Sequence, residues 1–187
     1  MNLDKKLIDK IVSVTSCAAA SCYKHVGKGN KEIADKAATD SMRKSLNKLN
    51  INGEVVIGEG ELDNAPMLYI GEKLGTGKGP SIDIAVDPLE GTNFAANNLP
   101  GALSVLAISS KGNLFKAPET YMEKIAVGKD IPLDATDLDF PVEKNIKNIA
   151  EFKNKNINEV TVCLLDRPRH KKIIDKLKIL NVNIKLI

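Results

Sequence analysis

Ile82-Asp83-Ile84-Ala85-Val86 leads directly into Asp87-Pro88-Leu89-Glu90-Gly91-Thr92, and this stretch decides the expected fold and site. The β-branched and apolar residues of the first part predict a buried strand. The second part places two carboxylates three positions apart at the strand end, with a Gly-Thr pair behind them. These groups suit divalent-metal phosphate chemistry, and the Gly91 and Thr92 amides are placed to face a phosphate. The alternative is an ordinary turn that caps a helix.

The composition indicates a globular protein without a strong electrostatic field. Of the 187 residues, 43% are hydrophobic, which is enough apolar material for a sizeable core. The net charge is only +3. The weak charge and the 4% aromatic content argue against nucleic acid as a partner. Cys17, Cys22 and Cys163 lack metal-type spacing, which fits a reducing compartment.

Targeting signals are also missing from the sequence pattern. The first residues do not form a signal-peptide core, and no apolar run is long enough to span a bilayer. We therefore expect a cytoplasmic protein with no membrane partner.

The order of predicted elements indicates an α/β protein with two domains. The first part has helical periodicity near residues 3–26, a second helix after it, and apolar strands around 55–57, 82–86 and 101–108. Residues 128–144 look like a linker. After it, the pattern alternates helix, strand, helix, strand, which is typical of a parallel sheet. We expect an α+β metal-site domain at 1–130 and the start of an α/β substrate domain at 131–187.

Acidic residues come from several separate predicted elements. A cluster of carboxylates without compensation is costly in a protein interior, and an oxygen-preferring divalent cation removes that cost. For any single acid, a solvated or capping role is the alternative. The acids that the pattern brings forward are Asp35, Glu59, Glu61, Asp63, Asp83, Asp87 and Glu90.

Four segments carry a resemblance to a known family. Residues 87–94 resemble the signature of the metal-dependent, lithium-sensitive sugar and inositol phosphatase superfamily. The Gly-Glu-Gly-Glu segment at 58–72, together with 75–79 and 117–124, is similar to the bacterial class II fructose-1,6-bisphosphatases. The resemblance implies a layered α-β-α-β sugar-phosphatase fold. It also implies that the C-terminal domain is incomplete here and lacks a further glutamate ligand.

The resemblance implies roles for individual residues. One divalent ion, Mn²⁺ or Mg²⁺, would be held by Asp35 and Glu59, and a second by Asp87 and Glu90. Thr92 would orient the attacking water and Asp63 would take its proton, near the further polar residue Lys31. The residues implied to contact substrate are Glu90, Gly91, Thr92, Tyr121, Arg167, Pro168 and Arg169.

The activity implied is hydrolysis of the 1-phosphate of fructose 1,6-bisphosphate in gluconeogenesis, by a homo-oligomeric dimer or tetramer. A catalytically impaired remnant that keeps some metal or phosphate binding is the alternative from a different class. Inositol-monophosphatase-like or sedoheptulose-bisphosphatase activity is a weaker alternative. Asn30 also departs from the family pattern, which has Asp before the lysine.

Two segments have competing interpretations. Residues 71–79 superficially suggest a nucleotide loop, but Thr76 and Gly79 occupy positions where a Walker loop needs glycine and a hydroxyl. The basic residues at 167–172 fit a solvated loop or a nucleic-acid patch as well as a phosphate site. Their place after a strand in an α/β unit favours phosphate. Without the resemblance, Tyr121 would be interpreted as a half-buried core residue.

Overall fold

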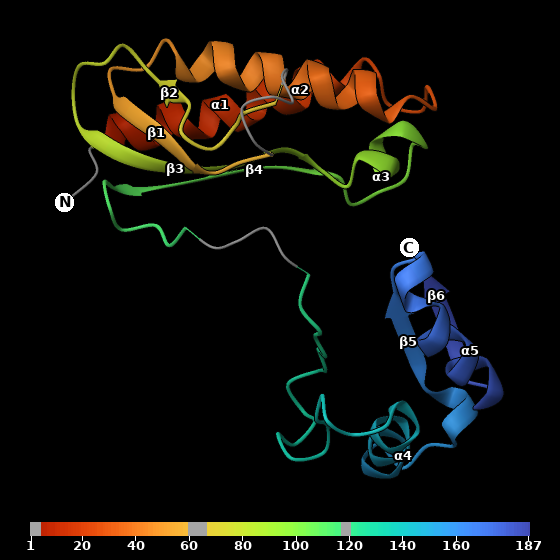
Figure 1. Ribbon diagram of the computed structural model, residues 1–187. Coiled ribbons are helices and arrows are strands. Elements are labelled where there is room, and N and C mark those ends of the chain that lie inside the picture. Colours follow the sequence, from red (N-terminus) through yellow and green to blue (C-terminus); the bar gives the residue numbers. More distant parts are fainter. Residues whose placement is uncertain (1–4, 60–66, 117–120) are drawn as a thin grey trace. The chain divides into compact units, whose positions relative to one another are not determined.

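The computed structural model describes residues 5–59, 67–116 and 121–187. The chain divides into two compact units, Met1–Pro118 and Glu119–Ile187, which are coloured red to green and green to blue in Figure 1. Each unit has its own helices and its own sheet, which confirms the predicted α/β class. No helix among the described residues combines the length and the apolar character needed to cross a bilayer.

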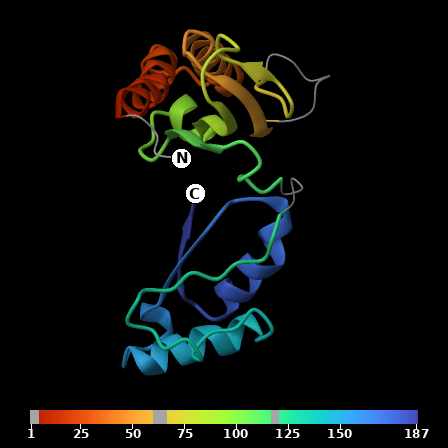
Figure 2. The ribbon, with the colours of Figure 1, turned by 90° about the vertical axis from the view of Figure 1, so that its left-hand side faces the viewer.

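Two long helices, α1 (Lys5–Tyr23) and α2 (Lys31–Leu46), cover one face of the sheet in the first unit (Figures 1 and 2). Along α1 the buried residues recur every three to four positions, which is the spacing of one helix face. Asn30 caps α2, because its side chain accepts a hydrogen bond of 3.0 Å from the Ile33 amide. Asn and Asp are equally good capping residues, so the departure at Asn30 leaves the helix start intact.

The sheet of the first unit is mixed, with strand order β2-β1-β3-β4. Its strands are β1 (Asn52–Ile57), β2 (Lys73–Leu74), β3 (Ser81–Glu90) and β4 (Leu103–Ser110). The β1–β3 pair is parallel, and the β1–β2 and β3–β4 pairs are antiparallel. Ile82, Ile84 and Val86 alternate along β3 and pack into the core under the helices.

The short helix α3 (Thr92–Ala96) follows β3 and fixes the connection between α1 and α2. The Gly27 and Gly29 amides each donate a 2.9 Å hydrogen bond to α3, to the carbonyls of Ala95 and Ala96. These bonds bring the start of α2 to the end of β3. Residues far apart in the sequence therefore meet at this corner of the sheet.

The second unit is smaller and has a two-stranded parallel sheet. Its core consists of five buried residues, Ile146, Ala150, Val160, Leu177 and Val182. The predicted alternation of helices and strands is confirmed, with two 3-10 turns in addition. The elements are α4 (Val142–Phe152), η2 (Ile157–Glu159), β5 (Thr161–Leu164), η3 (Pro168–His170), α5 (Lys171–Ile179) and β6 (Asn183–Leu186).

Candidate active site

A bulge at the end of β3 sets the positions of the two carboxylates in the signature stretch. The strand does not end at Val86, as the sequence suggested, but continues to Glu90. Its pairing with β4 shifts by one residue, because Asp87 pairs with Val105 whereas Glu90 pairs with Leu103. Pro88 lies inside this shift. Since proline has no amide to donate to a ladder, a bulge is where a strand tolerates it.

The bulge places the Asp87 and Glu90 side chains in contact. Residues three apart in a regular strand point to opposite faces, and one extra residue restores them to the same side. The pKa of Asp87 is raised to about 7, first by burial and then by the hydrogen bond and negative charge of Glu90. The Leu89 amide donates a 3.2 Å hydrogen bond to Asp87 Oδ1 and partly offsets this effect. The repulsion between two neighbouring anions thus favours the protonated form of Asp87.

Two further acids approach this pair from other elements. Asp35, on α2, is partly buried, and burial raises the pKa of its carboxyl group. Glu59 follows β1, and its pKa is raised by burial and then by the charge of Asp35. The charge of Glu59 in turn raises the pKa of Asp87. The four acids that the sequence singled out as metal ligands thus act on one another in the folded chain.

Hydrogen bonds from α2 and a neighbouring segment hold Glu59. The buried Thr39 hydroxyl donates to Glu59 Oε2 at 3.1 Å, and the Leu68 amide lies 3.5 Å from the same oxygen. Arg43 anchors the segment that contains Leu68, because its Nε donates to Glu72 Oε1 at 2.7 Å and its Nη2 donates to the Met67 carbonyl.

Sequence reasoning missed these supporting residues, although a signal was present. Thr39 and Arg43 follow Asp35 at intervals of four residues, so the three side chains lie on one face of α2.

The remaining predicted residues of the first unit are placed as follows. Lys31 is exposed at the first position of α2, one turn before Asp35. Gly91 adopts a left-handed conformation with φ of 78°, and Thr92 begins α3 directly behind it. Asp63 and Glu61 lie outside the described residues.

Asp83 does not join the group of acids, although the sequence placed it with them. It is buried, and its Oδ2 accepts hydrogen bonds of 2.6 Å and 3.2 Å from the amides of Gly112 and Leu114. Asp83 therefore stabilises the turn after β4, which is a structural role.

The arrangement of the acids bears on whether they can hold a divalent cation. Among residues 5–59, 67–116 and 121–187, no group of three or more metal-binding side chains is close enough to hold an ion. Asp87 and Glu90 are hydrogen-bonded to each other, whereas Asp35 and Glu59 interact through their charges. Their carboxylate oxygens are the hard, negatively charged donors that suit Mg²⁺ or Mn²⁺.

In the second unit, the structure brings two of the predicted substrate residues together. The Arg169 guanidinium carbon lies 4.1 Å from the centre of the Tyr121 ring, a cation–π distance. Pro168 is the first residue of η3, and Arg167 is its N-cap residue. Tyr121 is 84% exposed, so its interpretation as a half-buried core residue is wrong.

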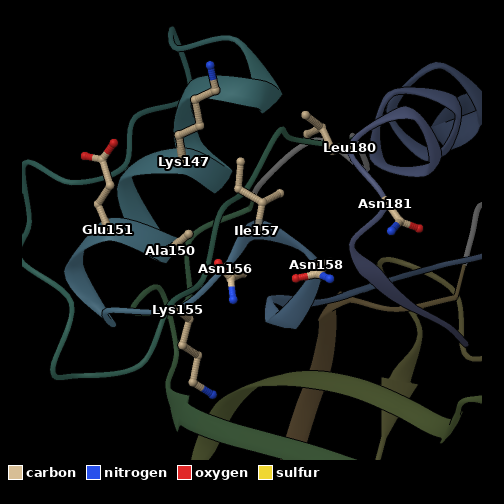
Figure 3. A pocket seen from close by; sticks show the side chains of 9 residues that line it. All are labelled: Lys147, Ala150, Glu151, Lys155, Asn156, Ile157, Asn158, Leu180 and Asn181. Carbon is tan, nitrogen blue, oxygen red and sulfur yellow. The ribbon is translucent and has the colours of Figure 1, made fainter.

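An open pocket of about 610 Å³ also lies in the second unit, between α4, η2 and the end of α5 (Figure 3). Lys147 and Lys155 line it but point away from each other, and Asn156, Asn158 and Asn181 also line it. Of the predicted site residues that the structure describes, none lines this pocket.

Comparison with known proteins decides the family. Residues 5–187 match the family of bacterial fructose-1,6-bisphosphatases encoded by glpX. The chain belongs to this family.

Curated relatives agree with the assignment. The chain is 46% identical over 180 residues to fructose-1,6-bisphosphatase 1 class 2 of Escherichia coli strain K12, covering 96% of this chain and 53% of that protein. It is 42% identical over 175 residues to fructose-1,6-bisphosphatase class 2 of Haemophilus influenzae, covering 94% of this chain and 52% of that protein. The chain thus spans about half the length of these relatives.

Proposed function

We propose that this chain functions in the metal-dependent hydrolysis of the 1-phosphate of fructose 1,6-bisphosphate. The proposal rests on four acids from three separate segments that lie close enough for their charges to interact. These acids are Asp35, Glu59, Asp87 and Glu90. Membership of a family whose relatives are named fructose-1,6-bisphosphatases supports the choice of substrate. A cytoplasmic role in gluconeogenesis, carried out by a homo-oligomer, is part of the proposal.

The acids would hold two divalent ions, Mn²⁺ or Mg²⁺, one between Asp35 and Glu59 and one between Asp87 and Glu90. Bound there, the ions supply Lewis acidity toward the phosphoryl group and its attacking water. Asp87 must first lose the proton that it shares with Glu90, because a coordinating carboxylate is ionised.

Polar groups around the acids would position the reacting atoms. The left-handed turn at Gly91 presents main-chain amides at the end of β3, next to the Thr92 hydroxyl. We assign to these amides the binding of phosphate oxygens and to Thr92 the orientation of the attacking water. Asp63 would accept the proton of that water, and Lys31 would add positive charge near the phosphate.

Tyr121, Arg167 and Arg169 of the second unit would bind the sugar-phosphate part of the substrate. The cation–π contact restrains the Arg169 side chain, which lowers the entropy that binding must remove. Guanidinium groups suit phosphate because they donate two parallel hydrogen bonds.

The test is release of inorganic phosphate from fructose 1,6-bisphosphate by the purified chain, measured with and without Mn²⁺. We expect release that depends on Mn²⁺ and is lost in Glu90→Gln. Release no greater than that of Glu90→Gln would contradict hydrolysis by this chain. Mn²⁺ binding without release would indicate residual metal binding as its function. Inositol monophosphate and sedoheptulose bisphosphate serve as competing substrates.

A further inference from the structure

Thr39 makes a hydrogen bond that is unusual for a hydroxyl in a helix. Helical Ser and Thr side chains commonly donate to a carbonyl one turn earlier in their own helix. Ser13, Thr15 and Ser16 of α1 do so, with distances of 2.9 to 3.0 Å. Thr39 instead donates to Glu59, twenty positions away in the sequence.

The environment of Thr39 makes this bond costly to lose. Its side chain is 1% exposed, and its neighbours Ala38 and Met42 belong to the hydrophobic core. A buried hydroxyl or carboxylate that loses its partner keeps its desolvation cost. The hydrogen bond between Thr39 and Glu59 should therefore persist in the folded chain.

The bond also sorts the two oxygens of the Glu59 carboxylate. Within the described residues, the hydroxyl of Thr39 and the amide of Leu68 both point to Oε2. This leaves Oε1 as the oxygen available to an external ligand. Because Asp35 lies one turn before Thr39 on α2, the same helix face supplies one acid and orients another.

We propose that Thr39 is a positioning residue for metal binding: its hydroxyl holds Oε2 of Glu59 and presents Oε1 to a divalent cation shared with Asp35. This inference rests on the metal site of the proposed function and adds a residue that touches neither metal nor substrate. Groups that orient ligating carboxylates commonly change metal affinity by about 10- to 100-fold when removed.

The experiment is a calorimetric titration of the purified chain with MnCl₂, run on the wild type and three variants. Thr39→Val removes the hydroxyl and keeps the shape of the side chain, whereas Thr39→Ser keeps the hydroxyl. Thr15→Val makes the same chemical change on α1, away from the acids, and is the matched control. Thermal unfolding without metal is measured for each variant.

We expect Thr39→Val to weaken Mn²⁺ binding about tenfold, while Thr39→Ser and Thr15→Val stay within about twofold of the wild type. All variants should remain folded without metal. Wild-type affinity in Thr39→Val would overturn the positioning role and leave the proposed function standing. Equal weakening in Thr39→Val and Thr39→Ser would also overturn it, because packing would then be the cause. Absence of Mn²⁺ binding by the wild type would overturn the proposed metal site and this inference together.

Discussion

The two units hold their candidate site residues in opposite ways. In the first unit, the acids are attached to a sheet and a helix that share a core with eighteen buried residues among those described. In the second unit, Tyr121 and Arg169 are exposed and in cation–π contact, and the described part of this unit has a core cluster of five buried residues. Like charges that are brought together need a rigid frame, because they repel each other. Basic groups at a surface need only be accessible to an anionic ligand.

This difference predicts unequal responses to the same loss of core volume. Leu177→Ala in the second unit and Met42→Ala in the first each remove a fully buried side chain and should each cost about 2–5 kcal/mol. We expect Leu177→Ala to unfold the second unit, because its small core leaves little stability to lose. Met42→Ala should leave the first unit folded but less stable.

Amide hydrogen exchange of the whole chain, followed separately in each unit, measures both responses. Loss of amide protection in α4 and α5 with retained protection in β3 is the expected pattern for Leu177→Ala. Similar loss of protection in both units, for either variant, would show that their stabilities are not set by core size.

The next effect concerns the Arg43–Glu72 ion pair, which anchors the segment that contacts Glu59. Arg43→Met leaves the carboxylate of Glu72, which is 10% exposed, without its ion pair. We expect the first unit to lose about 2–3 kcal/mol, less than for a fully buried pair because Arg43 is partly exposed.

Lys36→Met is the matched control for Arg43→Met, since it breaks an ion pair on the same helix whose two side chains are about half exposed. Its cost should stay below about 0.5 kcal/mol. Urea unfolding, monitored by hydrogen exchange in β1 and β3, gives both free energies. Equal costs would contradict the distinction between a frame contact and a surface pair.

The raised pKa of Asp87 predicts a pH dependence of the metal-free first unit. Asp87 has a pKa of about 7 in the folded chain against an ordinary value of 3.8, so the folded state holds a proton that the unfolded state has lost. The free energy of unfolding should therefore fall as the pH rises from about 4 to 7.

Thermal unfolding of the metal-free chain between pH 4 and pH 8 checks this slope, with Asp87→Asn as the variant that flattens it. Saturating Mn²⁺ should oppose the slope, because the metal competes with the proton. An unchanged slope in Asp87→Asn would refute the assignment to Asp87.

Glu54 predicts a smaller effect of opposite sign. Hydrogen bonds from Lys111 and Lys73, at 2.7 Å and 2.6 Å, lower the pKa of Glu54 from 4.5 to about 2. This stabilisation is present above about pH 4.5 and is lost as the pH falls toward 2. Both lysines are more than half exposed, so each pair should contribute no more than about 1 kcal/mol. Acid unfolding of Glu54→Gln should lack this component, and Glu151→Gln in the second unit, which removes an exposed carboxylate, is the control.

Periodicity was sufficient to predict the main elements. Apolar residues at helical spacing placed α1 and α2, and the β-branched and apolar residues at 82–86 placed most of β3 as a buried strand. The signature stretch was also recognised as the corner that carries carboxylates.

The geometry of that corner could not be predicted from the pattern. The bulge arises because Pro88 cannot join the ladder with β4 and the pairing shifts by one residue. Asp83 looked equivalent to Asp87, four positions later on the same strand. It differs because the turn at Gly112 supplies its hydrogen-bond donors, and this contact depends on the register of β4. Thr39 was missed because a buried threonine resembles any core residue until its partner is known.

We propose that acids from α2, β3 and the segment after β1 hold two divalent cations, one at Asp35 and Glu59 and one at Asp87 and Glu90. Calorimetric titration with MnCl₂ of the wild type, Glu59→Gln, Asp87→Asn and Glu54→Gln tests it most directly. We expect saturable binding by the wild type, loss of at least about tenfold in affinity in both Glu59→Gln and Asp87→Asn, and wild-type affinity in Glu54→Gln. Equal affinity in all four proteins, or no binding by the wild type, would contradict it.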